Sequence, residues 1–297
     1  MDVAESGMAQ NDELALSAGP GAVGGVVEAE RDRHRLRRTV RTTVALLLVL
    51  AVVRVFVFEP YAIPTGSMRP TIVEGDVLLV NKLPYIIRTL RTIPFTQVPL
   101  PQLEFPGLGS LQRGDVVVFD FPEESGDPAG VGEAFVKRVA ALGGDTVQLV
   151  AGRVCINGRE LAPSGAAAHL GERCAPIDQR RAAELLRYGG SVVVPYRGHV
   201  VALDSVAAAR WASLIYGEGS TVEYRNRIVF IDGLPATYYT FRRDYFFALG
   251  DNSGDSHDSR FFGFVPVENL IGQATMIYWS RDPATGVRWD RIGLTVQ

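Results

Sequence analysis

Ser67 stands in a segment whose residue types could support nucleophilic chemistry. It follows Gly66 and lies between Pro64 and Pro70. Proline fixes φ and glycine adds no side chain, so the segment predicts a rigid turn with a hydroxyl held in the open. The plain alternative is a turn of small residues without chemistry. A serine becomes a nucleophile only when a nearby base accepts its proton.

Lys137 is the strongest candidate for that base. Of the 30 basic residues in the chain, only Lys82 and Lys137 are lysines. A lysine kept in such an arginine-rich chain indicates chemistry that a permanently protonated guanidinium cannot perform. A strand period of two places Lys137 on one face with Phe135 and Val139, and apolar surroundings lower the pKa of an amine. A snorkelling or ion-paired lysine is the alternative, and Lys82, which closes another strand-like run, is predicted to be solvated.

A dense polar loop at 248–266 has apolar runs on both sides. Its hydroxyls, its carboxylates and Arg260 could form a hydrogen-bonded network that braces a catalytic strand. A Ca²⁺ loop is the rival interpretation, but the acids lack EF-hand spacing. The four histidines of the chain are scattered without ligand spacing, so no metal and no cofactor are predicted. His257 could form a Ser-His pair with Ser67. An α/β-hydrolase nucleophile elbow is excluded, because Arg69 stands where that motif needs a glycine.

The elements that must position these residues begin with a membrane anchor. Residues 42–58 are apolar except for Arg54, and an arginine cluster at 31–41 precedes them. This pattern predicts one membrane span with the amino terminus in the cytoplasm and the body outside it. Residues 1–41 are predicted to be a disordered cytoplasmic tail with a basic cluster. A buried core helix is the alternative for 42–58.

The body after the anchor is predicted to be mainly β. Short β-branched runs between turn signals recur at 76–81, 115–120, 135–140, 145–150, 191–194 and 199–203. Segments 144–158 and 219–233 align without gaps, and each predicts a hairpin closed by an Asn-Gly or Asp-Gly turn. Residues 178–187 and 206–216 are prone to form helices. The rest of 160–218 gives no fold prediction.

Three further expectations concern loops, cysteines and charge. The proline-rich stretch 94–106 is predicted to be an extended loop close to the membrane. Cys155 and Cys174 could form a disulfide on the outer side of a membrane, or could both remain thiols. The net charge of -3 gives no reason to expect nucleic acid as a partner.

Three motifs, taken in order after an amino-terminal span, resemble the type I signal peptidases, or leader peptidases. They are the segment from Pro64 to Met68, the segment from Phe135 to Val139, and Gly250-Asp-Asn followed by Asp258-Ser-Arg. The resemblance covers about residues 57–280 apart from insertions. Each motif alone is weak, but the ordered set is very specific.

The resemblance implies roles for individual residues. Ser67 would be the nucleophile and Lys137 the general base, while the Thr65 hydroxyl would join the Ser67 N–H in an oxyanion hole. Ser256 would orient the lysine amine, and Asp258 and Arg260 would brace the site. The substrate side chains would enter shallow apolar pockets formed by Ile63, Pro64, Met68, Ile72, Phe135 and Val136.

The resemblance also implies an architecture. An antiparallel β core at 59–145 and 243–297 would be interrupted by an inserted β-rich module at 146–242. Two positions depart from the family pattern: Ser253-Gly254-Asp255 fills the middle of the polar loop, and Gly143 replaces a usual proline. Neither departure touches Ser67 or Lys137.

The implied function is the removal of signal peptides from exported preproteins. The implied location is the bacterial inner membrane, with the catalytic body on the periplasmic side and with membrane lipid and preproteins as partners. Two alternatives stay open. One is a Ser-Lys peptidase with a narrow client, such as a pilin or a transfer protein. The other is a catalytically silent, anchored β domain that binds exported chains.

Overall fold

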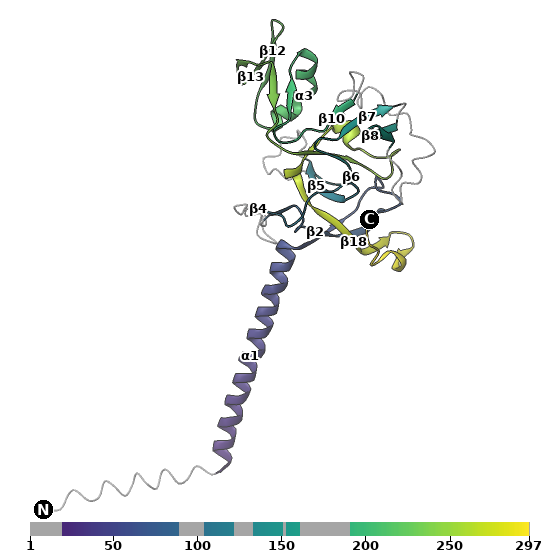
Figure 1. Cartoon of the computed structure of the whole chain (residues 1–297). Coiled ribbons are helices and arrows are strands. Elements are labelled where there is room, and N and C mark those ends of the chain that lie inside the picture. The colour runs from purple at the N-terminus through teal and green to yellow at the C-terminus, as the bar shows by residue number, and fades with distance from the viewer. Residues whose placement is uncertain (1–19, 89–103, 122–132, 151–152, 161–190, 297) are drawn as a thin grey trace, which may run out of the picture. The chain divides into compact units, whose positions relative to one another are not determined.

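The computed structural model describes residues 20–88, 104–121, 133–150, 153–160 and 191–296 of the 297-residue chain. These residues fall into two units, Met1–Arg54 and Val55–Gln297. The first unit contains most of one long helix. The second contains every strand that the structure describes (Figure 1).

Helix α1 (Pro20–Phe56) covers the apolar run and the arginine cluster before it. The predicted disorder of residues 1–41 is therefore wrong for residues 20–41. Helix extension fixes one residue for each new hydrogen bond, so a helix formed by the apolar run continues easily through the preceding alanine, glutamate and arginine residues. Residues 1–19 lie outside the described residues. Among the described side chains, no helix combines enough length with enough apolar character to cross a membrane.

The main sheet is antiparallel and carries the candidate site. Its strands run in the order β1-β2-β18-β5-β6-β16-β17, and β19 pairs with β18. This confirms the predicted mainly β class for the body. The strands are β1 (Phe58–Ala62), β2 (Asp76–Asn81), β5 (Val116–Phe121), β6 (Glu133–Leu142), β16 (Tyr245–Leu249), β17 (Val265–Pro266), β18 (Leu270–Asp282) and β19 (Gly286–Val287).

The strand period of two divides the core of this sheet between its two faces. In β5, Val116 and Val118 belong to one buried cluster, whereas Val117 and Phe119 belong to another. The ladder between β5 and β6 pairs Val117 with Lys137 and Val116 with Arg138. The two basic residues of β6 therefore leave the strand on opposite faces, as the alternation predicts.

In the described part of the chain, three smaller sheets lie between residues 146 and 240, and a fourth lies between residues 86 and 106. Strands β7 (Thr146–Val150), β8 (Arg153–Ile156), β9 (Arg159–Glu160) and β10 (Ser191–Val193) form one sheet, and β12 (Val222–Arg225), β13 (Ile228–Ile231) and β14 (Leu234–Pro235) form another. Strands β11 (Val200–Ala202) and β15 (Tyr238–Thr240) pair with each other, as do β3 (Ile86–Arg88) and β4 (Glu104–Pro106). The predicted boundaries of the inserted module stay a prediction, because Val55–Gln297 divides no further.

The two aligned segments form equivalent hairpins. Asn157 and Asp232 have φ values of 54° and 51°, and each precedes a glycine with positive φ. The side-chain oxygen of each accepts a hydrogen bond from the backbone N–H of Thr146 or Thr221, at 2.9 and 2.7 Å. These are the turn residues that a tight hairpin requires, so the hairpin prediction is confirmed.

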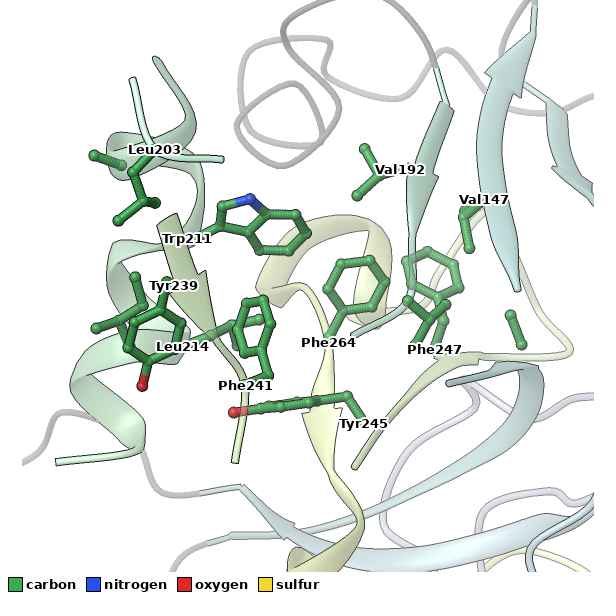
Figure 2. Packing of buried hydrophobic residues seen from close by; sticks show 14 of the residues in the cluster. Val147, Val192, Leu203, Trp211, Leu214, Tyr239, Phe241, Tyr245, Phe247 and Phe264 are labelled. Carbon is green, nitrogen blue, oxygen red and sulfur yellow. The ribbon is translucent and has the colours of Figure 1, made fainter. Parts of the chain in front are cut away.

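A large aromatic cluster joins the smaller sheets to the main one. Trp211 of helix α3 (Ser205–Gly217) contacts Phe241 edge-on and stacks on Phe264. Phe247, from β16 of the main sheet, contacts Phe264 in the same cluster (Figure 2). The helix predicted at 206–216 is confirmed, and its core face fixes the smaller sheets against the strand that leads into the polar loop.

Lys82 is buried, with 7% of its surface exposed, so the prediction that it is solvated is wrong. Its Nζ donates to Glu59 Oε2 at 3.2 Å, because the antiparallel pairing of β1 and β2 brings that carboxylate beside the end of β2.

Several predictions fall on residues that the structure leaves undescribed. Cys155 has a free thiol among the described residues, and Cys174 lies outside them, so the disulfide stays open. Most of the loop predicted at 94–106 and the whole helix predicted at 178–187 also lie outside them.

Candidate active site

Ser67 begins a tight turn that follows β1 by way of an extended segment. The turn is closed by backbone hydrogen bonds from Arg69 N to Gly66 O at 3.1 Å and from Ile72 N to Met68 O at 2.9 Å. Only 9% of the Ser67 surface is exposed. The hydroxyl is therefore held by a short, bonded piece of backbone, as the two prolines and the glycine predict. The prediction that it stands in the open is wrong, because Ser67 is buried in this structure.

Lys137 lies against this hydroxyl. Its Nζ donates to Ser67 Oγ at 2.7 Å, although the two residues are 70 positions apart in sequence. The residue is 4% exposed, and its amine lies 5.7 Å from the centre of the Phe135 ring. The pKa of Lys137 is lowered from 10.5 to about 8. Burial is the main cause and the positive charge of Arg260 acts in the same direction, whereas Asp258 and Asp251 act in the opposite direction.

The polar loop after β16 holds the turn from the other side. Asn252 donates its backbone N–H to the Ser67 carbonyl at 3.0 Å, and its side-chain amide donates to the Gly66 carbonyl at 3.1 Å. A Cβ on Gly250 would lie 2.5 Å from the Ser67 carbonyl oxygen and closer still to Ser256 Oγ. This close approach requires glycine at position 250.

Two buried ion pairs stiffen the loop. Arg138 donates through Nε and Nη2 to Asp251, at 2.8 and 2.7 Å, and Asp251 also accepts from the Thr71 hydroxyl at 2.5 Å. Asp258 caps the short helix α4 (Ser259–Phe262) and pairs with Arg260 at 2.8 Å. Because each charge has a partner of the opposite sign, their burial is tolerated.

The structure brings together most of the residues named from the sequence. Asp258 also accepts the backbone N–H of Gly250 at 3.0 Å, and Arg260 donates to the Ser253 carbonyl at 2.8 Å. Arg260 thus reaches into the altered segment 253–255. Thr65 lies two residues before Ser67 with its side chain exposed, where a bound chain could reach it.

The expected role of Ser256 is the orientation of the lysine amine. Ser256 is buried and lies beside Gly250, but its hydroxyl has no hydrogen-bond partner among the described residues. Within the part of the chain that the structure describes, the Lys137 amine donates to Ser67 and makes no hydrogen bond to Ser256. Orientation of the amine by Ser256 therefore stays a prediction.

The expected pocket residues divide between the two core clusters. Ile63, Met68 and Ile72 are buried together, and Val136 packs against them. Phe135 belongs to the cluster on the other face of the sheet, while Pro64 is exposed. Strand alternation explains the split, because Phe135 and Val136 are neighbours in β6.

Sequence reasoning missed Arg138, Thr71 and Asn252 as parts of this site. The alternation in β6 placed Arg138 opposite Lys137, but no local pattern revealed its partner 113 positions away. Among the described residues, no group of histidine, cysteine and acidic side chains could hold a metal ion.

The arrangement can activate a hydroxyl. An amine whose pKa is lowered to about 8 is partly neutral near pH 7–8, and at 2.7 Å it can accept the Ser67 proton. A serine hydroxyl and a lysine amine in such contact are the nucleophile and base that a hydrolase without a catalytic histidine requires.

The chain belongs to the signal peptidase family, peptidase S26, which matches residues 36–279. Ser67, Lys137 and the polar loop all lie within that match. The chain is therefore a serine endopeptidase of this family.

Two curated relatives illustrate the likeness. Signal peptidase I of Rickettsia typhi is 30% identical over 267 residues, which are 87% of this chain and 86% of that protein. Signal peptidase I of Aquifex aeolicus is 29% identical over 264 residues, which are 82% of this chain and 85% of that protein. A crystal structure of a signal peptidase I from Enterococcus faecalis shares 20% identity with a TM-score of 0.30, and it covers 57% of this chain and 100% of that chain.

Proposed function

We propose that the chain removes signal peptides from exported preproteins, with Ser67 as the nucleophile and Lys137 as the general base. The observation that carries the proposal is the 2.7 Å contact between the Lys137 amine and the Ser67 hydroxyl, in a site where burial lowers the pKa of the amine to about 8. Membership of the signal peptidase family supports the choice of substrate.

The reaction would proceed through an acyl-enzyme. Ser67 Oγ attacks the carbonyl carbon of the scissile bond while Lys137 Nζ takes the hydroxyl proton. The tetrahedral intermediate collapses as the same amine passes that proton to the leaving nitrogen, which frees the mature chain. A water molecule, deprotonated by Lys137, then hydrolyses the ester and releases the signal peptide.

The oxyanion of each intermediate needs donors fixed in advance. We assign the backbone N–H of Ser67 and the hydroxyl of Thr65 to that role. The hydrogen bonds from Asn252 to the carbonyls of Ser67 and Gly66 support this assignment, because they fix the peptide planes around the nucleophile. Donors held in this way cost no reorganisation at the moment of reaction.

The substrate would bind as an extended strand beside Ile63-Pro64 and Phe135-Val136. Side chains of small residues would point toward the cluster formed by Ile63, Met68 and Ile72. Shallow apolar pockets there would accept alanine-sized side chains.

We also propose that α1 anchors the enzyme in the bacterial inner membrane, with the catalytic body on the periplasmic side. The large apolar side chains of α1 between Val44 and Val53 are exposed, and Leu48, for example, is 62% exposed. A helix that is apolar on all sides needs an apolar environment. The arginines at 31–41 support a cytoplasmic amino terminus.

Cleavage of preproteins by purified enzyme tests the proposal. Ser67→Ala should abolish release of the mature chain, and His257→Ala should leave it intact. Cleavage by the Ser67→Ala variant would contradict the proposal. Several unrelated preproteins, compared side by side, would distinguish a general signal peptidase from a peptidase with a narrow client.

A further inference from the structure

A second charged cluster lies beneath the nucleophile turn and belongs to none of the motifs described above. Its centre is Asp76, a fully buried carboxylate at the start of β2. It accepts hydrogen bonds from the Ser280 hydroxyl at 2.6 Å and from the Val73 backbone N–H at 2.9 Å. The turn that carries Ser67 is therefore followed by a buried carboxylate, to which the backbone N–H of Val73 is hydrogen-bonded.

Arg291 neutralises this charge from a distant part of the chain. It ends the short 3-10 helix η3 (Trp289–Arg291) and donates to Asp76 through Nη2 at 2.7 Å and through Nε at 3.2 Å. Burial raises the pKa of Asp76, but hydrogen bonds from Arg291, Ser280 and Val73 outweigh burial and hold that pKa below its ordinary value. The carboxylate is thus kept ionised and paired.

The same guanidinium also holds the turn directly. Arg291 Nη2 donates to the Thr71 carbonyl at 3.1 Å. The Thr71 hydroxyl donates to Asp251, and Asp251 is paired with Arg138. Thr71 is therefore fixed by two hydrogen bonds: its carbonyl accepts from Arg291 of η3, and its hydroxyl donates to Asp251 of the polar loop.

Thr71 lies four residues after Ser67, in the same bonded turn. The backbone N–H of Ile72, which shares a peptide plane with the Thr71 carbonyl, donates to the carbonyl of Met68, the residue that follows the nucleophile. A shift of the Thr71 carbonyl would consequently move the backbone that sets the distance between Ser67 Oγ and Lys137 Nζ. A displacement of about 1 Å at a reacting group can lower a rate about a hundredfold.

We propose that Arg291, held in place by Asp76, is a positioning residue that keeps the Ser67 hydroxyl within reach of the Lys137 amine. This inference rests on the proposed function, because it concerns the same nucleophile. It assigns to the extreme carboxyl-terminal part of the chain a share in the alignment of the active site.

The test compares Arg291→Met with Arg113→Met in the full-length enzyme. Arg113 forms an ion pair with Asp145 in the same unit but makes no contact with the nucleophile turn, so it controls for the loss of an Arg–Asp pair. Turnover is measured per folded molecule, with the folded fraction taken from urea unfolding. Arg291→Met should lower kcat about 10-fold to 100-fold and leave KM within about twofold. Arg113→Met should change neither constant.

The pH profile supplies a readout that a merely stabilising ion pair would not produce. In Arg291→Met, the midpoint of the rise of kcat/KM with pH should stay at the wild-type value, because burial, Asp258, Arg260 and Asp251 shift the pKa of Lys137 and Arg291 is not among these causes. Only the plateau should be lower. Arg291→Lys retains a cation beside Asp76 but loses the planar fork, so its kcat should be intermediate.

A folded Arg291→Met enzyme with wild-type turnover, or one that differs only in KM, would overturn the inference. If Arg291→Met does not fold, Arg291→Lys decides: an unchanged kcat overturns the inference, and a fivefold or larger loss with constant KM supports it. Ser67→Ala separates the two levels. If that variant still cleaves, the proposed function itself fails, whereas an inactive Ser67→Ala with fully active Arg291 variants removes only this inference.

Discussion

At the scale of single residues, the proposed mechanism depends on the protonation state of one lysine. An amine in water would be almost fully protonated near neutral pH and could not act as a base. Burial of Lys137 beside Phe135 lowers its pKa to about 8, which leaves a useful neutral fraction. The partners Asp258 and Arg260 lie close enough to act on that pKa, but they act in opposite directions.

Lys137→Arg should abolish cleavage while the protein stays folded. Arginine keeps the charge and a similar length, but its guanidinium cannot accept the Ser67 proton. Preprotein cleavage and urea unfolding of the same preparation check the two halves of this prediction. An active Lys137→Arg enzyme would rule out the lysine as base, because a structural cation would tolerate arginine best of all.

Activity should rise with pH with an apparent midpoint near 8. The neutral amine is the active form, so below the midpoint kcat/KM should increase about tenfold per pH unit and above it should level off. A profile of kcat/KM between pH 6 and 10 measures this. A midpoint near 10.5, the ordinary value for a lysine, would show that burial does not tune the base.

Thr65→Val should lower kcat about a hundredfold or more and change KM little. Valine keeps the shape of the side chain but removes the hydroxyl donor, and a lost oxyanion donor typically costs about 3 kcal/mol in the transition state. Steady-state kinetics on a preprotein gives both constants. If the valine variant turns over at the wild-type rate, Thr65 is only a turn residue.

At the scale of elements, the site is the meeting of one strand and two loops. Strand β6 supplies Lys137 and Arg138 on opposite faces, and the polar loop after β16 bonds to the carbonyls of the turn that carries Ser67. The loop comes so close to the turn that Gly250 has no room for a side chain.

Gly250→Ala should lower kcat strongly, because the added methyl group would displace both the Ser67 carbonyl and the Ser256 side chain away from position 250. Gly217→Ala, at the end of α3, is the matched control: a Cβ there meets nothing within 4 Å, so activity and stability should be retained. Cleavage rates and unfolding midpoints of both variants are the measurements. Equal activity of the two variants would mean that the loop yields without moving the nucleophile.

At the scale of the whole molecule, the chain consists of a helical unit up to Arg54 and a β unit that contains the entire site. The proposed anchor would confine this site to the membrane surface where preproteins emerge. Such confinement would raise the local concentration of preprotein at the active site.

A cysteine placed at Ser6 should resist a membrane-impermeant thiol reagent in intact cells, because the arginines at 31–41 predict a cytoplasmic tail. A cysteine at the exposed Ser110 of the β unit is the control and should react. Both are introduced with Cys155 and Cys174 replaced by serine. Labelling at position 6 from outside would reverse the proposed orientation.

Features that depend on local patterns could be predicted from the amino-acid sequence. Alternating β-branched runs predicted strands such as β2 and β10, the Asn-Gly and Asp-Gly pairs predicted the twin hairpins, and the rarity of lysine singled out Lys137. Ordered motifs indicated the family. These signals are short-range, because periodicity and turn chemistry act over a few residues.

Contacts between groups far apart in the chain could not be predicted from local patterns and became visible in the folded protein. Local patterns missed the burial of Lys82 against Glu59, the bond of Arg138 to Asp251 across 113 positions, and the grip of Arg291 on Asp76 across 215 positions. Helix α1 also begins earlier than composition predicted. The choice of partner for a buried charge depends on strand order, register and the path of loops, and these follow from the packing of the whole core.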